Sequence, residues 1–584
     1  MRVQCRAGIS GMTQCVLYFL LFLCYTEAAP LISSPWGKIQ GITKSTRTGK
    51  TYNAYYAIPY ALPPIGKLRF RAPSPHPGVT GVFQALHYGL VCTQLHFDFG
   101  VLKVPWSEDC LTLDVHVPTS GGSDKSVMVW IHGGSFKSGG APLYEPWKLV
   151  TEQDVIVVVV QYRLGVFGFL STGNAEAPGN IGLLDQVLAL EWVQKNIASF
   201  GGDPNSVTIV GESAGAASVS LHTLSPRSKG LFRRAIMQSG AATSYWANDK
   251  AYREKLDRVS SAVNCSGKAT DKLTIACLRS RPSSVLLKVT DRMDAGPVVD
   301  GYFMPDDPGT LIKNATYLSD LGFYDVDTML GVNNNEGGVL LESAENADRQ
   351  DNTSTAKTLN SFDTYNNKII PDLLKSTYGQ YDAILADVIS YEYTAPRTEN
   401  QKTLDINDVF HTFGDASFVV PAVAYARRHC DSGNLGGTGN TYFYYFNHYP
   451  SFAAGSGTHG MYHAFDLPYM FGLSSISTSV FGLLGPITQE EQTLSSTYVS
   501  FLADFAKTGN PSSAVQHQLG STWKQFDSQD ETYLSFTTNM TLEHHLQAKR
   551  VSFWLNLMPE LFKLEKAKVA APTNEHHGTS ILVG

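Results

Sequence analysis

The sequence predicts an α/β fold in which helices cover both faces of a mostly parallel central sheet. Three observations predict it. Residues 155–160 (VIVVVV) are six uninterrupted aliphatic residues, which is typical of a strand buried on both faces of a parallel sheet. Strand-like and helix-like segments alternate along the chain. The GESAG motif at residues 211–215 joins a β-branched run directly to a run of small helix formers.

The expected strands are short apolar runs, and the last of them is rich in aromatic residues. They cover residues 127–131, 155–160, 207–210, 235–238, 328–332 and 442–446. Between the second and third of these strands, apolar residues recur at helical spacing, at Leu184, Val187, Leu188 and Trp192. Because no long polar linker divides the chain, we expect residues 30–568 to form one domain and residues 569–584 to form a loose tail.

Composition excludes several classes of protein. The 584 residues are 43% hydrophobic and 17% charged, which argues against a disordered chain, a collagen or a coiled coil. The net charge of −7 argues against a nucleic-acid partner, because nucleic-acid binders usually carry a basic surface. We expect neither a metal ion nor a cofactor.

The N-terminus has the pattern of a secretory signal peptide over residues 1–29. Arg2 and Arg6 precede a short apolar run at residues 16–24, and small residues follow up to Ala29. A membrane anchor is the alternative, but nine apolar residues are too few to cross a bilayer that needs roughly 20. No second apolar run reaches that length, and the final residues are not an ER-retention signal. We therefore expect a secreted protein without a transmembrane anchor.

Cysteine spacing agrees with a secreted chain. After the signal peptide, two close pairs predict local disulfides, Cys92 with Cys110 and Cys265 with Cys277, and leave Cys430 as a buried free thiol. Four sequons predict glycosylation sites on accessible loops, at Asn264, Asn314, Asn352 and Asn539.

The GESAG motif points to a nucleophilic serine. G-x-S-x-G alone is a weak signal, and an ordinary glycine-rich turn is the alternative. Its position between a strand and a helix is typical of a strained turn that exposes a serine hydroxyl, here Ser213. The glycines are needed because side chains two residues before and after the serine would clash in so tight a turn.

A serine nucleophile that transfers acyl groups also needs donors for the oxyanion. Upstream, the strand at 127–131 enters the sequence HGGSF at residues 132–136. This segment matches glycine-rich loops that supply backbone N–H groups, although a plain turn is the alternative.

With these motifs, the chain resembles the type-B carboxylesterase/cholinesterase family. The resemblance rests on residues 200–215, which begin FGGDPN and end GESAG, and on EDCLTLDV at residues 108–115, and it extends from about residue 50 to Trp554. It implies the α/β-hydrolase fold, hydrolysis of small-molecule carboxylic esters, and the same two disulfides.

The resemblance also places the catalytic acid. In this fold the chain order is serine, acid, histidine. The family's acid is a glutamate that follows a strand and precedes a glycine, which corresponds to Glu336 in GVNNNEGG at residues 331–338.

Two histidines compete for the role of base. The family pattern is His-Gly-x-Glu with Phe-Gly eight residues after the histidine. His463 has Phe-Gly at that spacing, in residues 471–472, although Ala464 replaces the glycine and Asp466 replaces the glutamate. His459 keeps a following glycine but lacks the acid. We therefore favour His463.

By the same resemblance, the oxyanion donors are the N–H groups of Gly134, Ser135 and Ala214. Ser135 replaces a family glycine and adds a side chain beside the acyl carbon. Ser239 resembles the family serine that helps to orient the acid and the histidine, although an ordinary serine at a strand end is the alternative.

Two alternatives to a general carboxylesterase remain. A cholinesterase would stack its quaternary ammonium on a tryptophan ten residues before Cys110, but Gly100 stands there. The phenylalanine pair of that acyl pocket is also absent, since Asp291 and Met293 stand in its place. A catalytically inactive adhesion protein of the neuroligin type shares the Gly-Gly-Ser sequence, but such proteins have lost the nucleophile, which is kept here as Ser213. The natural ester and the oligomeric state stay open.

Overall fold

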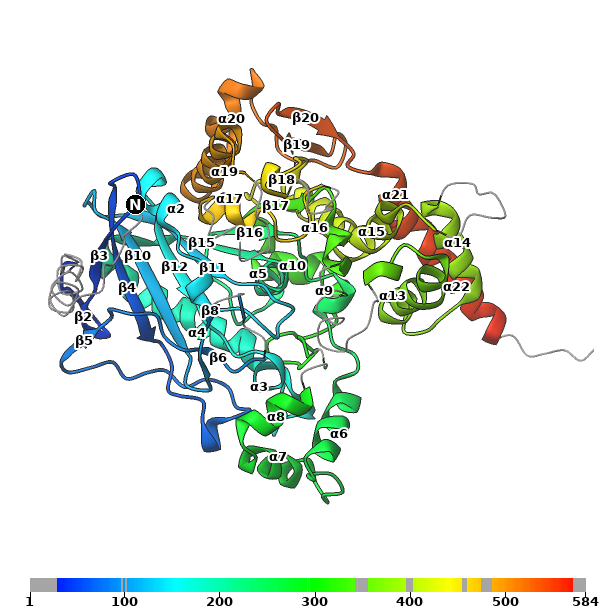
Figure 1. Cartoon of the computed structure of the whole chain (residues 1–584), viewed down its shortest axis with the longest axis horizontal. Coiled ribbons are helices and arrows are strands. Elements are labelled where there is room, and N and C mark those ends of the chain that lie inside the picture. The colour runs from blue at the N-terminus through cyan, green and yellow to red at the C-terminus, as the bar shows by residue number, and fades with distance from the viewer. Residues whose placement is uncertain are drawn as a thin grey trace, which may run out of the picture.

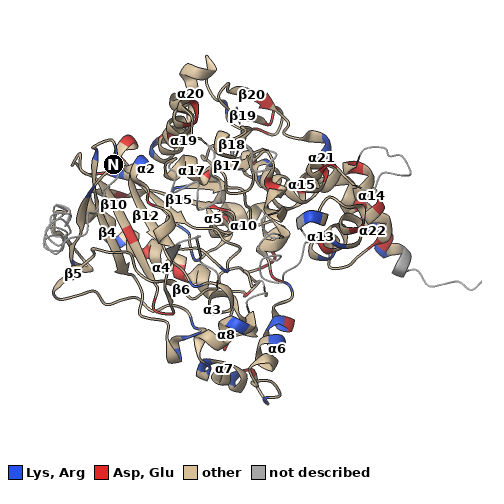
Figure 2. Ribbon diagram, in the orientation of Figure 1, with Lys and Arg blue, Asp and Glu red and all other residues tan. Residues whose placement is uncertain are grey.

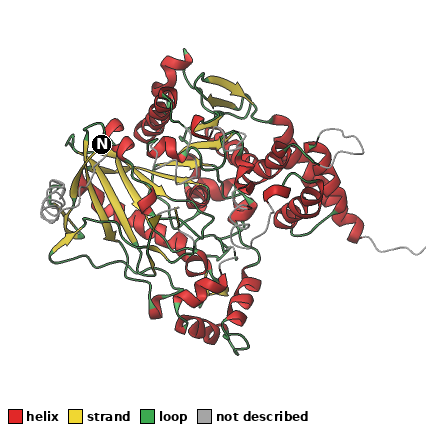
Figure 3. Cartoon of the chain, viewed as in Figure 1, coloured by secondary structure: helices red, strands yellow, loops and turns green. Residues whose placement is uncertain are grey.

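A central sheet of eleven strands organises the molecule (Figure 3). The computed structural model describes residues 29–570 except 96–97, 100–101, 291–292, 294, 342–343, 345–355, 395–402, 454–459 and 474–485. Seven neighbouring strands run parallel and the strands at both edges run antiparallel. In spatial order the strands are β20 (Thr541–His544), β19 (Thr532–Phe536), β18 (Thr441–Phe446), β17 (Asp327–Asn333), β16 (Arg234–Gln238), β15 (Gly202–Glu212), β11 (Lys125–Ile131), β12 (Ile156–Val160), β10 (Thr112–Pro118), β4 (Thr51–Pro59) and β3 (Ile42–Ser45).

Both faces of this sheet are buried. Because side chains alternate along a strand, Val127, Val129 and Ile131 of β11 enter one apolar core, while Met128 and Trp130 enter the other. Helices α4 (Ile181–Asn196) and α5 (Ala214–Leu224) belong to the first core. Helices α2 (Trp147–Gln153) and α19 (Gln489–Thr508) belong to the second. The aliphatic run in β12 is therefore fully buried, as its sequence predicts.

The expected elements are present. Five of the six predicted strands fall within observed ones, the sixth begins one residue later than predicted, at Ile156, and the predicted apolar helix is α4. The α/β-hydrolase fold is confirmed. Further central and C-terminal helices are α12 (Phe362–Thr364), α13 (Ile370–Tyr378), α14 (Ala383–Tyr393), α15 (Ile406–Gly414), α16 (Val420–His429), α17 (Leu467–Phe471), α20 (Ser512–Leu519), α21 (Ala548–Ser552) and α22 (Met558–Ala570), with π-helical turns η8 (Tyr365–Ile369), η9 (Asp415–Val419) and η12 (Phe553–Leu557).

The predicted signal peptide and the predicted C-terminal tail lie mostly outside the described residues. The predicted signal peptide lies there except for Ala29, which is buried. Helix α22 continues to Ala570, so the expected boundary at residue 568 falls inside this helix, and the rest of the predicted tail is not described.

A helical lobe projects from the sheet domain at the bottom of Figure 1. It contains α6 (Tyr252–Ala262), α7 (Asp271–Ser280) and α8 (Ser283–Thr290), which share a small apolar core with α3 (Gly165–Phe169). A disulfide between Cys265 and Cys277 ties the end of α6 to α7.

Smaller elements complete the described fold. Strands β1 (Ile32–Ser34), β2 (Gly37–Gln40) and β5 (Val82–Gln84) form a separate sheet, and two short helices are α9 (Pro308–Leu311) and α10 (Ala315–Leu321).

A buried ion pair joins the sheet to helix α4. Arg163, just after β12, donates from Nε and Nη2 to the carboxylate of Asp185, at 2.7 and 2.6 Å. Its Nη1 also donates to the carbonyl of Arg71 at 2.8 Å. Asp185 is fully buried, so removing either partner leaves a charge without compensation in the core.

We predict that Asp185→Ala lowers the free energy of unfolding by about 3–5 kcal/mol, because Arg163 then stays buried without its counter-ion. Thermal or urea unfolding of the purified chain measures this loss. The matched control is Glu560→Ala, which removes the solvent-exposed ion pair to Lys563 and should cost less than about 1 kcal/mol. Equal losses in the two variants would contradict the prediction.

Candidate active site

Ser213 occupies a sharp turn between β15 and α5. Its backbone lies at φ 56° and ψ −122°, a conformation that non-glycine residues rarely adopt. A Cβ on Gly211 would overlap the backbone of Gly215, and one on Gly215 would overlap the carbonyl of Ile131. The Ser213 N–H donates to the carbonyl of Gln238 at 2.8 Å, which ties the turn to the neighbouring strand β16. The glycines of the motif are therefore required by close backbone contacts, as the sequence predicts.

Glu336 and His463 meet, although 127 residues separate them in the chain. Glu336 begins the turn η6 (Glu336–Gly338) after β17, and His463 follows β18. His463 Nδ1 lies 2.7 Å from Glu336 Oε2. The other carboxylate oxygen accepts from the Ser239 hydroxyl at 2.5 Å and from the Asn333 N–H at 2.6 Å. This contact orients Nδ1 of the imidazole toward Glu336. The other ring nitrogen, Nε2, then faces the end of β15, directly before Ser213.

His459 is the other histidine that the sequence offers as the base. His459 lies outside the described residues.

A second carboxylate faces the other ring nitrogen of His463. Glu212, the residue directly before Ser213, places Oε1 3.2 Å from His463 Nε2. Burial alone would lower the pKa of His463, but Glu212 and Glu336 outweigh it and raise the pKa to about 9. Sequence reasoning missed this contact, although the acidic residue inside the GESAG motif was the available signal.

Asp466 lies behind the pair of Glu336 and His463. Its carboxylate accepts hydrogen bonds from the Tyr498 hydroxyl at 3.0 Å, from Gln238 Nε2 at 3.1 Å and from Asn333 Nδ2 at 3.3 Å. Burial, helped by the charge of Glu336, raises the pKa of Asp466 to about 6. The aspartate that replaces the family's glutamate is therefore held by three donors.

An aromatic ring covers one face of the imidazole. The ring centroid of Phe418 lies 4.3 Å from that of His463, with 34° between the planes. Phe418 belongs to the π-helix η9, whose Asp415 pairs with Arg550 Nε at 3.0 Å. Sequence reasoning missed Phe418, because no local motif indicates which distant ring will reach the histidine.

The loop after β11 lies directly against Ser213. A Cβ added to Gly133 would come within 3.0 Å of the Ser213 Cβ. Gly134, Ser135 and Phe136 all have positive φ, at 107°, 55° and 58°. Ser135 keeps the left-handed conformation despite its side chain, which is exposed. The loop therefore turns sharply beside Ser213, where an oxyanion-binding loop is expected.

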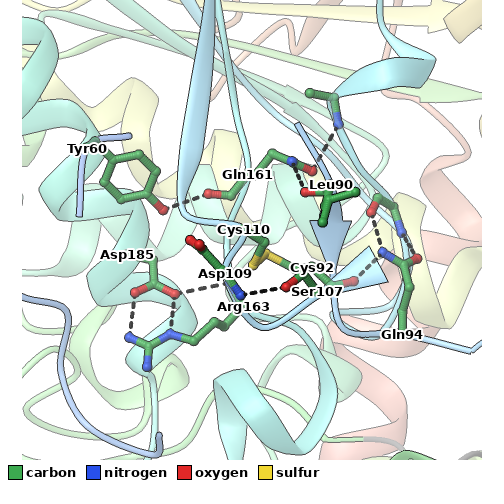
Figure 4. Close-up of a disulfide and its surroundings, with 12 residues drawn as sticks. Tyr60, Leu90, Cys92, Gln94, Ser107, Asp109, Cys110, Gln161, Arg163 and Asp185 are labelled. Atoms are coloured by element: carbon green, nitrogen blue, oxygen red, sulfur yellow. Dashed lines mark hydrogen bonds and ion pairs between the residues drawn. A yellow bond between two sulfur atoms is a disulfide. The ribbon is translucent and has the colours of Figure 1, made fainter. Parts of the chain in front are cut away.

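The first disulfide supports this loop (Figure 4). Cys92 and Cys110 are bonded, as predicted. Two residues after Cys92, the side-chain amide of Gln94 donates to the Gly139 carbonyl at 2.7 Å, and its oxygen accepts from the Gly139 N–H at 2.9 Å. The disulfide loop thus holds both backbone groups of a residue at the end of the Gly134 loop. Sequence reasoning did not anticipate this link.

The other predicted cysteine and sequon positions can be placed. The second predicted disulfide is also formed, and Cys430 is a free thiol that is half-buried rather than buried. Asn264, Asn314 and Asn539 are exposed, whereas Asn352 lies outside the described residues. Within residues that the structure describes, no group of three or more His, Cys, Asp or Glu side chains is arranged to hold a metal ion. Across that same part of the chain, no helix is long and apolar enough to cross a membrane.

The chain is similar to known proteins over most of its length. The Carboxylesterase family model matches residues 28–554. Human carboxylesterase 5A is 37% identical over 528 residues, which cover 87% of this chain and 85% of that protein. Dog carboxylesterase 5A is 35% identical over 93% of this chain and 92% of its own length. Mouse neuroligin-3 is 32% identical over 93% of this chain and 71% of its own length. On this match across nearly its whole length, the chain belongs to the carboxylesterase family.

Proposed function

We propose that the protein is a secreted serine hydrolase of carboxylic esters that works through an acyl-enzyme. The observation that carries the proposal is the 2.7 Å contact between His463 and Glu336, next to a serine held at positive φ by its turn. A serine hydroxyl needs a base, and the base needs a group that fixes its tautomer. The carboxylesterase relatives support the same activity.

In the proposed mechanism, Ser213 attacks the ester carbonyl while His463 takes its proton. Glu336 keeps the imidazole in the required tautomer and stabilises the imidazolium that forms. The N–H groups of Gly134, Ser135 and Ala214 bind the oxyanion. His463 then returns the proton to the leaving alcohol, and water releases the acyl group by the same steps. Ser239, which donates to Glu336, orients the acid.

The surroundings of His463 support a neutral, apolar ester as substrate. Phe136, Trp246 and Phe418 form a row of rings, with centroids 6.3 and 5.8 Å apart, that ends on His463. Apolar acyl chains gain from contact with such a row. The choline-binding tryptophan has no counterpart in the sequence, since Gly100 stands at its position.

An adhesion function is the second candidate, because mouse neuroligin-3 is 32% identical over 93% of the chain. Ser213, Glu336 and His463 argue for an enzyme, since a protein that only binds a partner needs no such combination. Secretion is supported by the signal-like N-terminus, the two disulfides and the exposed sequons.

We predict that Ser213→Ala removes turnover of p-nitrophenyl acetate and labelling by a fluorophosphonate probe, while the thermal midpoint changes little. The hydroxyl is the attacking group, and alanine keeps the turn's Cβ. Ser218→Ala, one turn further along α5, is the matched control and should keep both activities. If Ser213→Ala retained most turnover, the proposed nucleophile would be wrong, and if the wild type had none, the adhesion function would be favoured.

A pH profile tests the charge around His463. A general base must be neutral, so activity is lost below its pKa, and a pKa raised to about 9 predicts that kcat/KM keeps rising up to about pH 9. Glu212→Gln removes one negative neighbour and should move this limb toward lower pH. Asp257→Asn, on the exposed face of α6, is the control and should leave the profile unchanged. A limb near pH 6.5 in the wild type would count against the prediction.

Substrate preference separates the proposed function from that of a cholinesterase. We expect p-nitrophenyl butyrate to be cleaved at least as well as the acetate, and acetylthiocholine to be cleaved poorly, because no tryptophan is available at the choline position. Steady-state kcat/KM values for the three esters measure this. A higher value for acetylthiocholine than for the neutral esters would favour the cholinesterase alternative.

A further inference from the structure

The lobe formed by α6, α7 and α8 carries a charge opposite to that of the whole protein. The chain has a net charge of −7, yet residues 252–290 contain eight basic and three acidic side chains. From Lys272 to Thr290 the basic residues are Lys272, Arg279, Arg281 and Lys288, with no acidic residue among them. Figure 2 shows blue Lys and Arg segments on the helices of this lobe.

A second basic segment packs against this lobe. Arg69, next to the turn η1 (Gly66–Leu68), donates from Nη1 to the carbonyls of Leu278, Arg279 and Arg281, at 3.3, 3.1 and 2.6 Å. In return, Arg279 Nε donates to the Arg69 carbonyl at 2.8 Å. Glu108 neutralises Arg69, but Lys67 and Arg71 on either side of it are exposed. We group the exposed and half-buried cations of these adjoining segments as the basic face: Lys67, Arg71, Lys272, Arg279, Arg281 and Lys288.

No ion pair offsets the positive charge of the basic face among the described residues. Within the described part of the chain, none of its six side chains forms an ion pair with a carboxylate. Arg279 and Arg281 donate to backbone carbonyls, which leaves their charge in place. Burial lowers the pKa of Arg279, and the nearby charge of Arg71 lowers it further, while Glu176 partly opposes them. Like charges held this close favour an anion from outside.

Exposed apolar side chains lie on the same segments as these cations. Ile65, Leu273 and Val285 are 53%, 51% and 42% exposed, one on each of the segments that form the basic face. On α7 the opposite side is buried, through Ile275 and Leu278, so this helix is amphipathic, and the disulfide at Cys277 holds it in place. A sulfated polysaccharide would bind the cations but gain little from the apolar side chains. The headgroup region of a lipid bilayer accommodates both kinds of side chain.

From this combination we propose that the basic face docks the protein on anionic phospholipid surfaces. Phosphate and carboxylate headgroups pair with the lysines and arginines, while Ile65, Leu273 and Val285 enter the interface. The contact is peripheral and reversible, and it weakens as salt rises. It does not rest on ester hydrolysis, because none of these residues belongs to the proposed catalytic machinery.

Vesicle co-sedimentation with the full chain tests the proposal. At physiological ionic strength the wild type should bind vesicles of phosphatidylcholine with about 30% phosphatidylserine and should not bind phosphatidylcholine alone. Lys272→Glu with Lys288→Glu should lower the partition coefficient at least about tenfold, since each lysine near an anionic surface adds to binding. The matched control is Lys38→Glu with Lys50→Glu, which changes the net charge equally on exposed lysines elsewhere and should bind like the wild type.

A second pair of variants separates lipid from polysaccharide. Leu273→Ser with Val285→Ser should weaken vesicle binding and leave the elution salt from a heparin column unchanged. Absence of vesicle binding, or equal binding by the two lysine variants, overturns the proposal. Retention on heparin that depends on Lys272 and Lys288 without any vesicle binding would assign the face to a sulfated polysaccharide instead. Thermal midpoints of all variants show that each is folded, independently of any esterase activity.

Discussion

The backbone conformation of Ser213 is the constraint on which the candidate site depends. Holding a non-glycine residue at such a φ and ψ costs on the order of 1–3 kcal/mol and persists only where the surroundings fix it. Here α5 packs so closely on β11 that residue 215 has no room for a Cβ, and the Gln238 carbonyl holds the Ser213 N–H. The core of the sheet thereby determines where the hydroxyl lies, and the loop containing Gly133 lies against the same turn.

Charge around His463 follows from the same geometry. The turn at Ser213 places Glu212 beside Nε2 of the imidazole, and Glu336 contacts the other ring nitrogen, Nδ1. Together they favour the imidazolium, which is the species that forms when a serine gives up its proton. In the proposed mechanism, a smaller fraction of His463 is neutral at neutral pH, but the imidazolium formed during the reaction is stabilised. Asp466, held by three donors, has a pKa raised to about 6, is still mostly ionised at neutral pH, and also raises the pKa of His463.

Local patterns in the sequence predicted much of the fold and part of the site. The β-branched runs predicted the central strands because burial on both faces demands them, and the glycine spacing predicted the turn at Ser213. Glu336 and His463 were placed through family resemblance and spacing, and the structure brings them into contact. The contacts of Phe418 and Gln94 were not predictable, because each depends on how segments far apart in the chain meet. The contact of Glu212 was missed, although the GESAG motif contains that acidic residue. Phe418 lies 45 residues before His463, and Gln94 lies 45 residues before Gly139. Contacts over such distances in the chain produce no periodic pattern in the sequence.

The distances along the chain between these residues have a consequence for biosynthesis. Ser213 and His463 are 250 residues apart, and β18, which precedes His463, must insert beside β17 before the histidine can reach Glu336. At ribosomal rates of about 5–20 residues per second, the histidine is made roughly 10–50 s after the serine. The proposed nucleophile is thus synthesised well ahead of the proposed base, so the proposed mechanism implies a nascent chain that does not cleave esters until β18 has paired with β17.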